Sequence, residues 1–139
     1  MKKLLVTLLL VSVSSVAFAK NDIVTFPLSD VLNSPKAKEV LDPNIQISFG
    51  SGTKGNIIKA QLQSSKKTNA VGKSDQEACN WALLSALKTF QQRAIQEGGT
   101  KVINLTGYYY KNSFDSKTQF QCGVGNIMAS VTLKGDIAK

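Results

Sequence analysis

The two cysteines are the first residues of this sequence that could do chemistry. Cys79 and Cys122 are the only cysteines in the chain, and the chain has no histidine. Two thiolates do not complete a structural zinc site, because such a site takes four ligands. In an exported chain, which the N-terminal residues predict, a lone pair of cysteines is typical of a disulfide. We therefore expect a bond between Cys79 and Cys122 and no bound metal.

Three glycines could form a phosphate-binding loop. Gly50, Gly52 and Gly55 fit the pattern G-x-G-x-x-G. A dinucleotide site also needs a helix that begins at the third glycine, so that the helix N-terminus meets the pyrophosphate. Residues 56–63 instead alternate between apolar and polar side chains, as a strand does. We interpret the glycines as the turn of a β-hairpin and expect no cofactor.

The tripeptide at residues 72–74, Gly-Lys-Ser, resembles the end of an ATP-binding Walker A loop. The full motif requires a glycine five residues before Gly72, and that position is Lys67. Ser74 is better explained as the N-cap of a helix. We predict no ATP binding.

The sequence has no obvious centre for acid–base or nucleophilic catalysis. Histidine, the commonest general base, is absent, and the nine carboxylates are scattered along the chain. We therefore predict no catalytic residues and a protein that is not an enzyme. A hydrolase would need a Ser–Lys or carboxylate pair that converges only in the folded chain.

Aromatic and basic side chains suggest a binding surface instead. Tyr108, Tyr109 and Tyr110 form the one aromatic cluster, Trp81 lies off the apolar stripe of a predicted helix, and Lys66-Lys67 is a pair of adjacent cations. In a strand, Tyr109 would pack inward and the other two tyrosines would line the opposite face. The candidate binding surface consists of Trp81, Tyr108, Tyr110, Lys66 and Lys67.

The N-terminal residues predict export. Residues 1–19 combine a basic start, an apolar run and the small-x-small sequence Ala-Phe-Ala, which are the parts of a cleavable signal peptide. The apolar run is too short for a transmembrane anchor, and no lipidation signal follows it. We expect a periplasmic or secreted protein in which residues 20–139 form a single α+β domain.

The chain is basic, with a formal net charge of +8. Such a surface favours solubility or contact with an anionic partner. The only arginine is Arg93, and specific reading of nucleic acids usually relies on several arginines. We therefore expect no specific nucleic-acid partner.

One long helix organises the predicted fold. Residues 74–99 begin with a capping box, Ser74 and Glu77, and end at Gly98-Gly99. One apolar stripe recurs at spacings of three and four: Cys79, Ala82, Leu83, Ala86, Leu87, Phe90 and Ala94. Its alanines predict close packing on a sheet.

The remaining segments predict the strands. Residues 21–26 resemble an edge strand, residues 28–41 a short helix or two, and residues 45–49 and 56–63 a β-hairpin. Residues 64–73 read as an exposed loop, residues 101–110 as a strand, and residues 118–133 as the last strand, with Ile127, Ala129, Val131 and Leu133 on one face. The fold class is therefore α+β: the order β-β-α-β-β, with the long helix on a mainly antiparallel sheet.

Several segments of the sequence resemble a family of small exported bacterial proteins of unknown function, which often carry the label "excinuclease ATPase subunit". The resemblance covers essentially all of residues 20–139. It lies in residues 36–43 (KAKEVLDP), 49–50, 67–74 (KTNAVGKS), 78–82 (ACNWA), 92–94, the three tyrosines, Cys122-Gly123 and residues 133–135. The helix ending in glycine and the strand after it also resemble, more distantly, the YbjQ-like and RcsF-like α+β folds. The second of these is a disulfide-stabilised envelope stress sensor. The resemblance implies the fold and the compartment.

From these observations we expect a non-enzymatic periplasmic protein, monomeric or self-assembling, that binds an envelope protein or an anionic component of the cell envelope. The alternative is a small-molecule-binding module that uses the face carrying Tyr108 and Tyr110. A hydrolase ranks third.

Overall fold

A computed structural model describes residues 21–139. The predicted signal peptide, residues 1–19, lies outside the described residues. The elements are β1 (Asn21–Pro27), α1 (Leu28–Leu32), α2 (Pro35–Val40), β2 (Gln46–Phe49), β3 (Ile57–Asn69), α3 (Asp75–Gln96), β4 (Lys101–Gly107), the 3₁₀ turn η1 (Tyr109–Lys111), β5 (Gln119–Gly125) and β6 (Met128–Ala138). No helix among these residues is long and apolar enough to cross a membrane.

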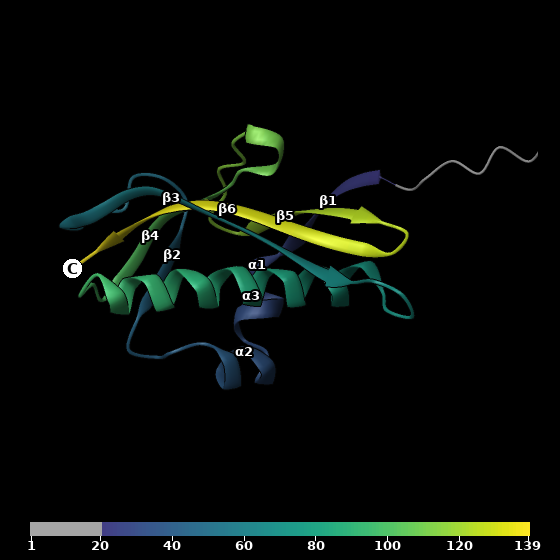
Figure 1. The fold of residues 1–139 in the computed structure, drawn as a ribbon, viewed down its shortest axis with the longest axis horizontal. Coiled ribbons are helices and arrows are strands. Elements are labelled where there is room, and N and C mark those ends of the chain that lie inside the picture. The colour runs from purple at the N-terminus through teal and green to yellow at the C-terminus, as the bar shows by residue number, and fades with distance from the viewer. Residues whose placement is uncertain (1–20) are drawn as a thin grey trace, which may run out of the picture.

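The six strands form one mixed sheet around β6. On one side, β6 pairs with β5 near its start and with β4 near its end; on the other side, it pairs along its whole length with β3. β1 pairs with β5, and β2 lies parallel to β4 at the far edge; the other pairings are antiparallel. One face of this sheet is covered by α3, with α1 and α2 on the same side (Figure 1). The predicted α+β class, with one long helix on a mainly antiparallel sheet, is confirmed.

The predicted ends of α3 are confirmed. The Ser74 hydroxyl accepts a hydrogen bond from the Glu77 amide at 3.1 Å. Gly98 follows the helix with a φ of +73°, and the Gly99 amide donates to the Ala94 carbonyl at 2.8 Å, so a left-handed glycine closes the C-terminus. Ser34 caps α2 in the same way as Ser74 caps α3, through the Ala37 amide.

The apolar stripe of α3 forms the centre of the core. All seven predicted positions are buried: Cys79, Ala82, Leu83, Ala86, Leu87, Phe90 and Ala94. They belong to one continuous cluster with Val131, Leu133 and Ile137 of β6. Four residues of the stripe, three alanines and a cysteine, are small, so the helix backbone can lie close to the sheet.

The predicted disulfide is confirmed. Cys79 in the first turns of α3 is bonded to Cys122 in β5, with their Cα atoms 5.9 Å apart. Both residues are fully buried. The bond therefore fastens the N-terminal half of α3 to the β1–β5 side of the sheet. The glycine cap lies at the opposite end of the helix.

The predicted hairpin of residues 45–49 and 56–63 is wrong. β2 pairs with β4 and β3 pairs with β6, so the two strands do not contact each other as partners. The alternation of apolar residues identified both strands, but alternation fixes only which side chains share a face and leaves the partner strand open. The glycine turn between them instead lies close to Ile103 and Ala138, which Gly55 approaches.

The predicted loop at residues 64–73 is also wrong in its first half. β3 continues to Asn69, and residues 62–69 pair in unbroken register with residues 135–128 of β6. Their polar side chains resemble those of a loop because β3 is an edge strand, and edge strands carry polar and charged residues.

The predicted last strand, residues 118–133, is two strands. β5 ends at Gly125 and β6 begins at Met128, so the chain reverses at residues 126–127. Ala129, Val131 and Leu133 are buried on one face as expected, but Ile127 lies in the turn and is exposed. The predicted strand 101–110 stops at Gly107, which places the tyrosines beyond it.

A carboxylate on β6 supports irregularities in both neighbouring strands. Gln61 of β3 and Asn104 of β4 have left-handed backbones, with φ of 56° and 55°, where the strand registers shift. Asp136 lies between them and accepts hydrogen bonds from the Gln61 amide at 2.7 Å and the Asn104 side-chain amide at 2.9 Å. The Asn104 side-chain oxygen in turn accepts from the Thr53 amide at 2.9 Å. The bulges thus depend on one side chain.

Removing the disulfide should lower stability substantially. The bond joins residues 43 positions apart, and for a loop of that length the chain-entropy model gives about 3–4 kcal/mol. We expect Cys79→Ser/Cys122→Ser, or reduced protein, to melt well below the oxidised protein in a calorimetric scan. Equal melting temperatures for the oxidised and reduced forms would contradict this expectation.

Substitution of Asp136 should weaken the sheet in two steps. Asp136→Asn keeps an acceptor for Gln61 but turns an amide toward the Asn104 amide, so we expect a loss of about 1 kcal/mol in the free energy of unfolding. Asp136→Ala removes both acceptors and should cost about 2 kcal/mol. Urea denaturation measures both, with the exposed Asp22→Asn as control. The same loss for Asp22→Asn and Asp136→Ala would refute this role.

Candidate functional site

The face of the sheet opposite α3 is the candidate site, and we call it the open face. Figure 1 shows α3 on one side of the sheet and the η1 turn rising from the other. The β6 side chains that alternate with its buried ones, such as Ser130 and Thr132, point to the open face and are half-buried. The pairing places Ser65 and Lys67 of β3 opposite Thr132 and Ser130.

Tyr109 lies directly on this face. Gly123 of β5 is buried, and a Cβ atom at that position would overlap the Tyr109 ring and hydroxyl. The absence of a side chain at Gly123 therefore makes room for the tyrosine. Gly123 is thus a point where an aromatic ring closely approaches the strand backbone.

Tyr110 stands beside Tyr109 and is exposed to solvent. The two rings meet edge to face with their centroids 4.5 Å apart, and Tyr110 is 72% exposed. The backbone is left-handed at both Tyr110 and Lys111, with φ of 49° and 62°. Such conformations are unfavourable for residues other than glycine, and they occur often at binding sites. The turn thus holds an aromatic ring away from the core.

The environment of Tyr109 changes its acidity. Desolvation by burial raises the pKa of Tyr109 above its ordinary value, a hydrogen bond with the Ser130 side chain partly offsets this rise, and the neighbouring Tyr110 adds to it. The phenol therefore keeps its proton and can both donate and accept a hydrogen bond at neutral pH.

Hydroxyl groups and a lysine surround the two tyrosines. The side chains of Ser65 and Thr132 share a hydrogen bond of 2.9 Å across the strands. The hollow between them and η1 has a volume of about 410 Å³ and is lined by Asn21, Ser65, Lys67, Tyr109, Tyr110, Gly123, Gly125, Met128, Ser130 and Thr132. These residues include a cation and several hydrogen-bonding groups but no carboxylate. The hollow suits a hydroxyl-rich or anionic ligand.

The structure does not bring the five predicted site residues together. Tyr110 and Lys67 line the hollow. Tyr108 lies next to it, with the Lys134 ammonium 4.7 Å from its ring centroid. Lys66 pairs with the buried Val131, so it lies on the helix-covered face. Trp81 lies on α3, remote from the tyrosines in the fold.

The predicted roles of the tyrosines within a strand are wrong. Tyr109 does not pack into the core between sheet and helix; it lies with Tyr110 on the open face. The reason is that β4 ends at Gly107, after which η1 abandons the alternation of a strand. Sequence reasoning missed the hydroxyl groups of the hollow, which belong to Ser65, Tyr109, Ser130 and Thr132. The spacing of two between Ser65 and Lys67 and between Ser130 and Thr132 was the available signal for the strand residues, but the sequence predicts a loop at residue 65.

Trp81 lines a second hollow, between α2 and α3. It is 37% exposed, and the Lys36 ammonium lies 4.7 Å from its ring centroid. The groove has a volume of about 400 Å³ and also contains Asn80, whose buried side-chain oxygen has no hydrogen-bond partner in the described part of the chain. Trp81 therefore belongs to a different surface from Tyr110.

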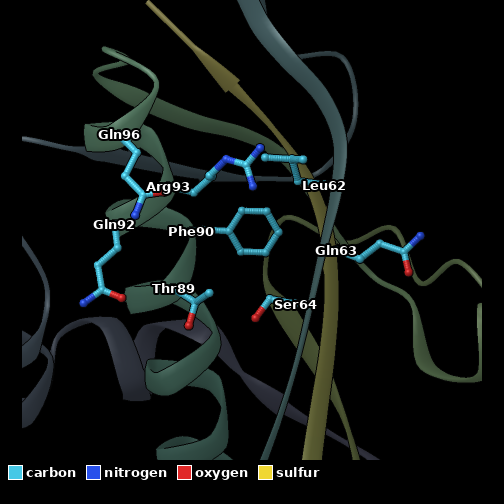
Figure 2. A pocket seen from close by; sticks show the side chains of 8 residues that line it. All are labelled: Leu62, Gln63, Ser64, Thr89, Phe90, Gln92, Arg93 and Gln96. Atoms are coloured by element: carbon cyan, nitrogen blue, oxygen red, sulfur yellow. The ribbon is translucent and has the colours of Figure 1, made fainter.

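A third hollow lies between β3 and α3, and Figure 2 shows its lining. It measures about 240 Å³ and is bounded by Leu62 and Ser64 on the strand and by Thr89, Phe90 and Arg93 on the helix. Ser64 is buried, and its hydroxyl has no hydrogen-bond partner in the part of the chain that the structure describes. Within residues 21–139, no group of three or more potential metal ligands occurs here or elsewhere.

The position of Tyr109 predicts an abnormal alkaline titration. In an ultraviolet absorbance titration, one tyrosine should ionise at a pH above the ordinary pKa of tyrosine. Tyr109→Phe should remove this ionisation from the titration curve. Gly123→Ala should push the ring into solvent and return its pKa toward the ordinary value.

The same shift has a consequence for stability. Folding raises the pKa of Tyr109. The contribution of this group to the free energy of unfolding is therefore fully present below pH ~10, the pKa of an unfolded tyrosine, and is lost as the pH rises through the pKa of Tyr109 in the folded protein. A normal titration of all three tyrosines in the folded protein would contradict the placement of Tyr109.

Comparison with known proteins identifies no relative. No protein-family model, no curated protein and no solved structure matches the chain. Function must therefore be inferred from the geometry of the described residues.

Proposed function

We propose that this protein is a non-enzymatic periplasmic binding protein whose open face binds an anionic component of the cell envelope. The observation that carries the proposal is the hollow beside η1, where an exposed tyrosine, a lysine and several hydroxyls converge without a carboxylate. Aromatic rings bind the apolar faces of ligands, and hydroxyls and ammonium groups bind their polar and anionic groups.

The charges around the hollow support an anionic ligand. Lys67 lies in the hollow, Lys134 lies over Tyr108, and Lys111 is exposed at the end of η1. Asp136 accepts hydrogen bonds from Gln61 and Asn104 and does not line the hollow. Several cations on one face attract anions at moderate salt, and the attraction weakens as salt increases.

The periplasmic location rests on two separate features. Residues 1–19 have the sequence of a cleavable signal peptide. The disulfide between Cys79 and Cys122 is consistent with an oxidising compartment outside the cytoplasm. The resemblance to small exported bacterial proteins agrees with this location, and membership of that family is part of the proposal.

A small soluble ligand is the second candidate for the same hollow. Its volume of about 410 Å³ is within the range of small-molecule sites, and the Tyr109–Tyr110 pair supplies an aromatic wall. A thermal-shift screen of anionic sugars and nucleotides tests this candidate, and a ligand that stabilises the wild type but not Tyr110→Ala would favour it over a polymer.

A hydrolase ranks below both; Ser130→Ala tests it in an ester-hydrolysis assay, because Lys67 lies opposite Ser130.

Binding to a polyanion should depend on the open face rather than on total charge. We expect the mature protein to bind immobilised dextran sulfate and not neutral dextran, and Lys67→Gln and Tyr110→Ala to elute at clearly lower sodium chloride concentrations. Lys88→Gln is the matched control, because it removes the same charge from an exposed position on α3.

Two results would refute this function. Failure of the wild type to bind dextran sulfate at low salt would exclude a general affinity for polyanions. Equal elution shifts for Lys67→Gln and Lys88→Gln would show that net charge, not the open face, determines binding. A pull-down from a periplasmic extract then identifies the natural component, and recovery of nothing at any salt would count against the proposal.

A further inference from the structure

β3 forms a long free edge of the sheet. It has thirteen residues and pairs with β6 on one side, and no strand of the described chain pairs with its other side. The backbone amides and carbonyls along that side can therefore accept another strand. From Leu62 to Asn69 the register with β6 is unbroken, so this part of the edge is regular.

The groove between β3 and α3 runs beside this edge. Phe90, which is 2% exposed, forms its apolar floor, and Leu62 and Thr89 stand on its two walls. Figure 2 shows the strand and the helix facing each other across the groove, with Arg93 at one end. A strand added to β3 would direct every second side chain into this groove.

Ser64 supplies an unsatisfied hydrogen-bonding group in the groove. It is 8% exposed, its hydroxyl has no partner among residues 21–139, and in Figure 2 it points toward the helix. Thr89, opposite, does not satisfy it: the Thr89 hydroxyl donates to the Ser85 carbonyl at 3.1 Å, and no hydrogen bond joins it to Ser64 in the described part of the chain. Buried hydroxyls are rarely left unpaired, and an orphan in a groove points to a missing ligand group.

Arg93 gives the groove a positive end. Its Nε donates to the Glu97 carboxylate at 2.9 Å, while the two terminal amino groups of the guanidinium have no partner among the described residues. β3 itself contains Lys59, Lys66 and Lys67 and no acidic residue. The lysines of β3 and the terminal amino groups of Arg93 that Glu97 leaves unpaired therefore both offer positively charged donors to an incoming strand.

We propose that this groove binds an extended acidic peptide segment of a partner protein, which adds to β3 as a seventh strand. The backbone of the segment would pair with residues 62–69. One of its side chains would reach the Ser64 hydroxyl over Phe90, and an acidic side chain two residues away, about 6.6–6.8 Å along the strand, would meet Arg93. A second copy of the chain is disfavoured, because its own β3 carries three lysines and offers no carboxylate to Arg93. The site is separate from the hollow at Tyr110 and does not rest on the function proposed for it.

A designed peptide tests the proposal directly. The probe is acetyl-(Glu-Thr)₄-amide, which is acidic and favours extended structure. We expect it to shift the amide resonances of residues 62–69 and 89–96 in nuclear magnetic resonance spectra and to slow hydrogen exchange at β3. Acetyl-(Glu-Pro-Pro-Glu)₂-amide has the same charge but lacks half of the backbone donors on each edge of the strand, and acetyl-(Gln-Thr)₄-amide lacks the charge; both should bind at least about tenfold more weakly.

Variants separate a binding role from a structural one. Arg93→Gln should weaken binding by about fivefold or more, and Arg93→Lys, which keeps the charge, should weaken it less. Ser64→Ala should weaken binding without lowering the melting temperature, because it removes an unpaired buried hydroxyl. Tyr110→Ala should bind the peptide normally, and Ser64→Ala should elute normally from dextran sulfate, so the two sites fail independently.

Three outcomes would overturn the proposal. The first is equal binding of the proline peptide, which would mean that charge alone attracts the probe. The second is a set of shifted resonances confined to the open face. The third is a Ser64→Ala variant that is destabilised but keeps its affinity for the peptide, which would mean that the hydroxyl serves stability and not binding. If Ser64→Ala does not fold, unchanged peptide affinity of Arg93→Gln would overturn the proposal instead.

Discussion

The packing of one narrow helix face on β6 is the contact on which the rest of the structure depends. The small residues Cys79, Ala82 and Ala86 let α3 lie close to the sheet, and the larger Leu83, Leu87 and Phe90 fill the space beside it. The helices cover only one of the two faces of the sheet, with α1 and α2 on the same side as α3. The fold therefore has a buried face, an open face and a groove where the helix meets the edge strand, and each surface that could bind a ligand follows from that arrangement.

The disulfide and the glycine cap fix the two ends of this contact. Cys79 is bonded to Cys122 near the start of α3, and Gly99 turns the chain directly into β4 at its end. With both ends held, the helix cannot slide along the sheet without breaking a covalent bond or the tight turn. The groove beside β3 is therefore bounded by a helix that is fixed at both ends, and the Ser64 hydroxyl is buried in it without a hydrogen-bond partner among the described residues.

The open face is irregular where the function is proposed. β4 bulges at Asn104 and ends at Gly107, which allows η1 to turn back over β5 and place Tyr109 on Gly123. Asp136 supports the bulges in β3 and β4 with two hydrogen bonds, so a side chain at one end of β6 maintains the geometry of its neighbours. These departures from regular strands create both the hollow and the exposed position of Tyr110.

Sequence patterns alone determined the helix, the disulfide and the class of the fold. Ser74, Glu77 and Gly98 define α3 through local hydrogen bonding and backbone freedom, and two cysteines leave one possible pair. The sequence patterns did not determine which strands pair. They predict that β2 and β3 pair with each other, and they place Ser65 and Lys67 in a loop. Alternation encodes which face a residue occupies, whereas pairing depends on contacts between residues far apart in the chain. For the same reason, only the tertiary structure separated Lys66 from Lys67, brought Tyr109 to Ser130, and left Ser64 unpaired beside Arg93.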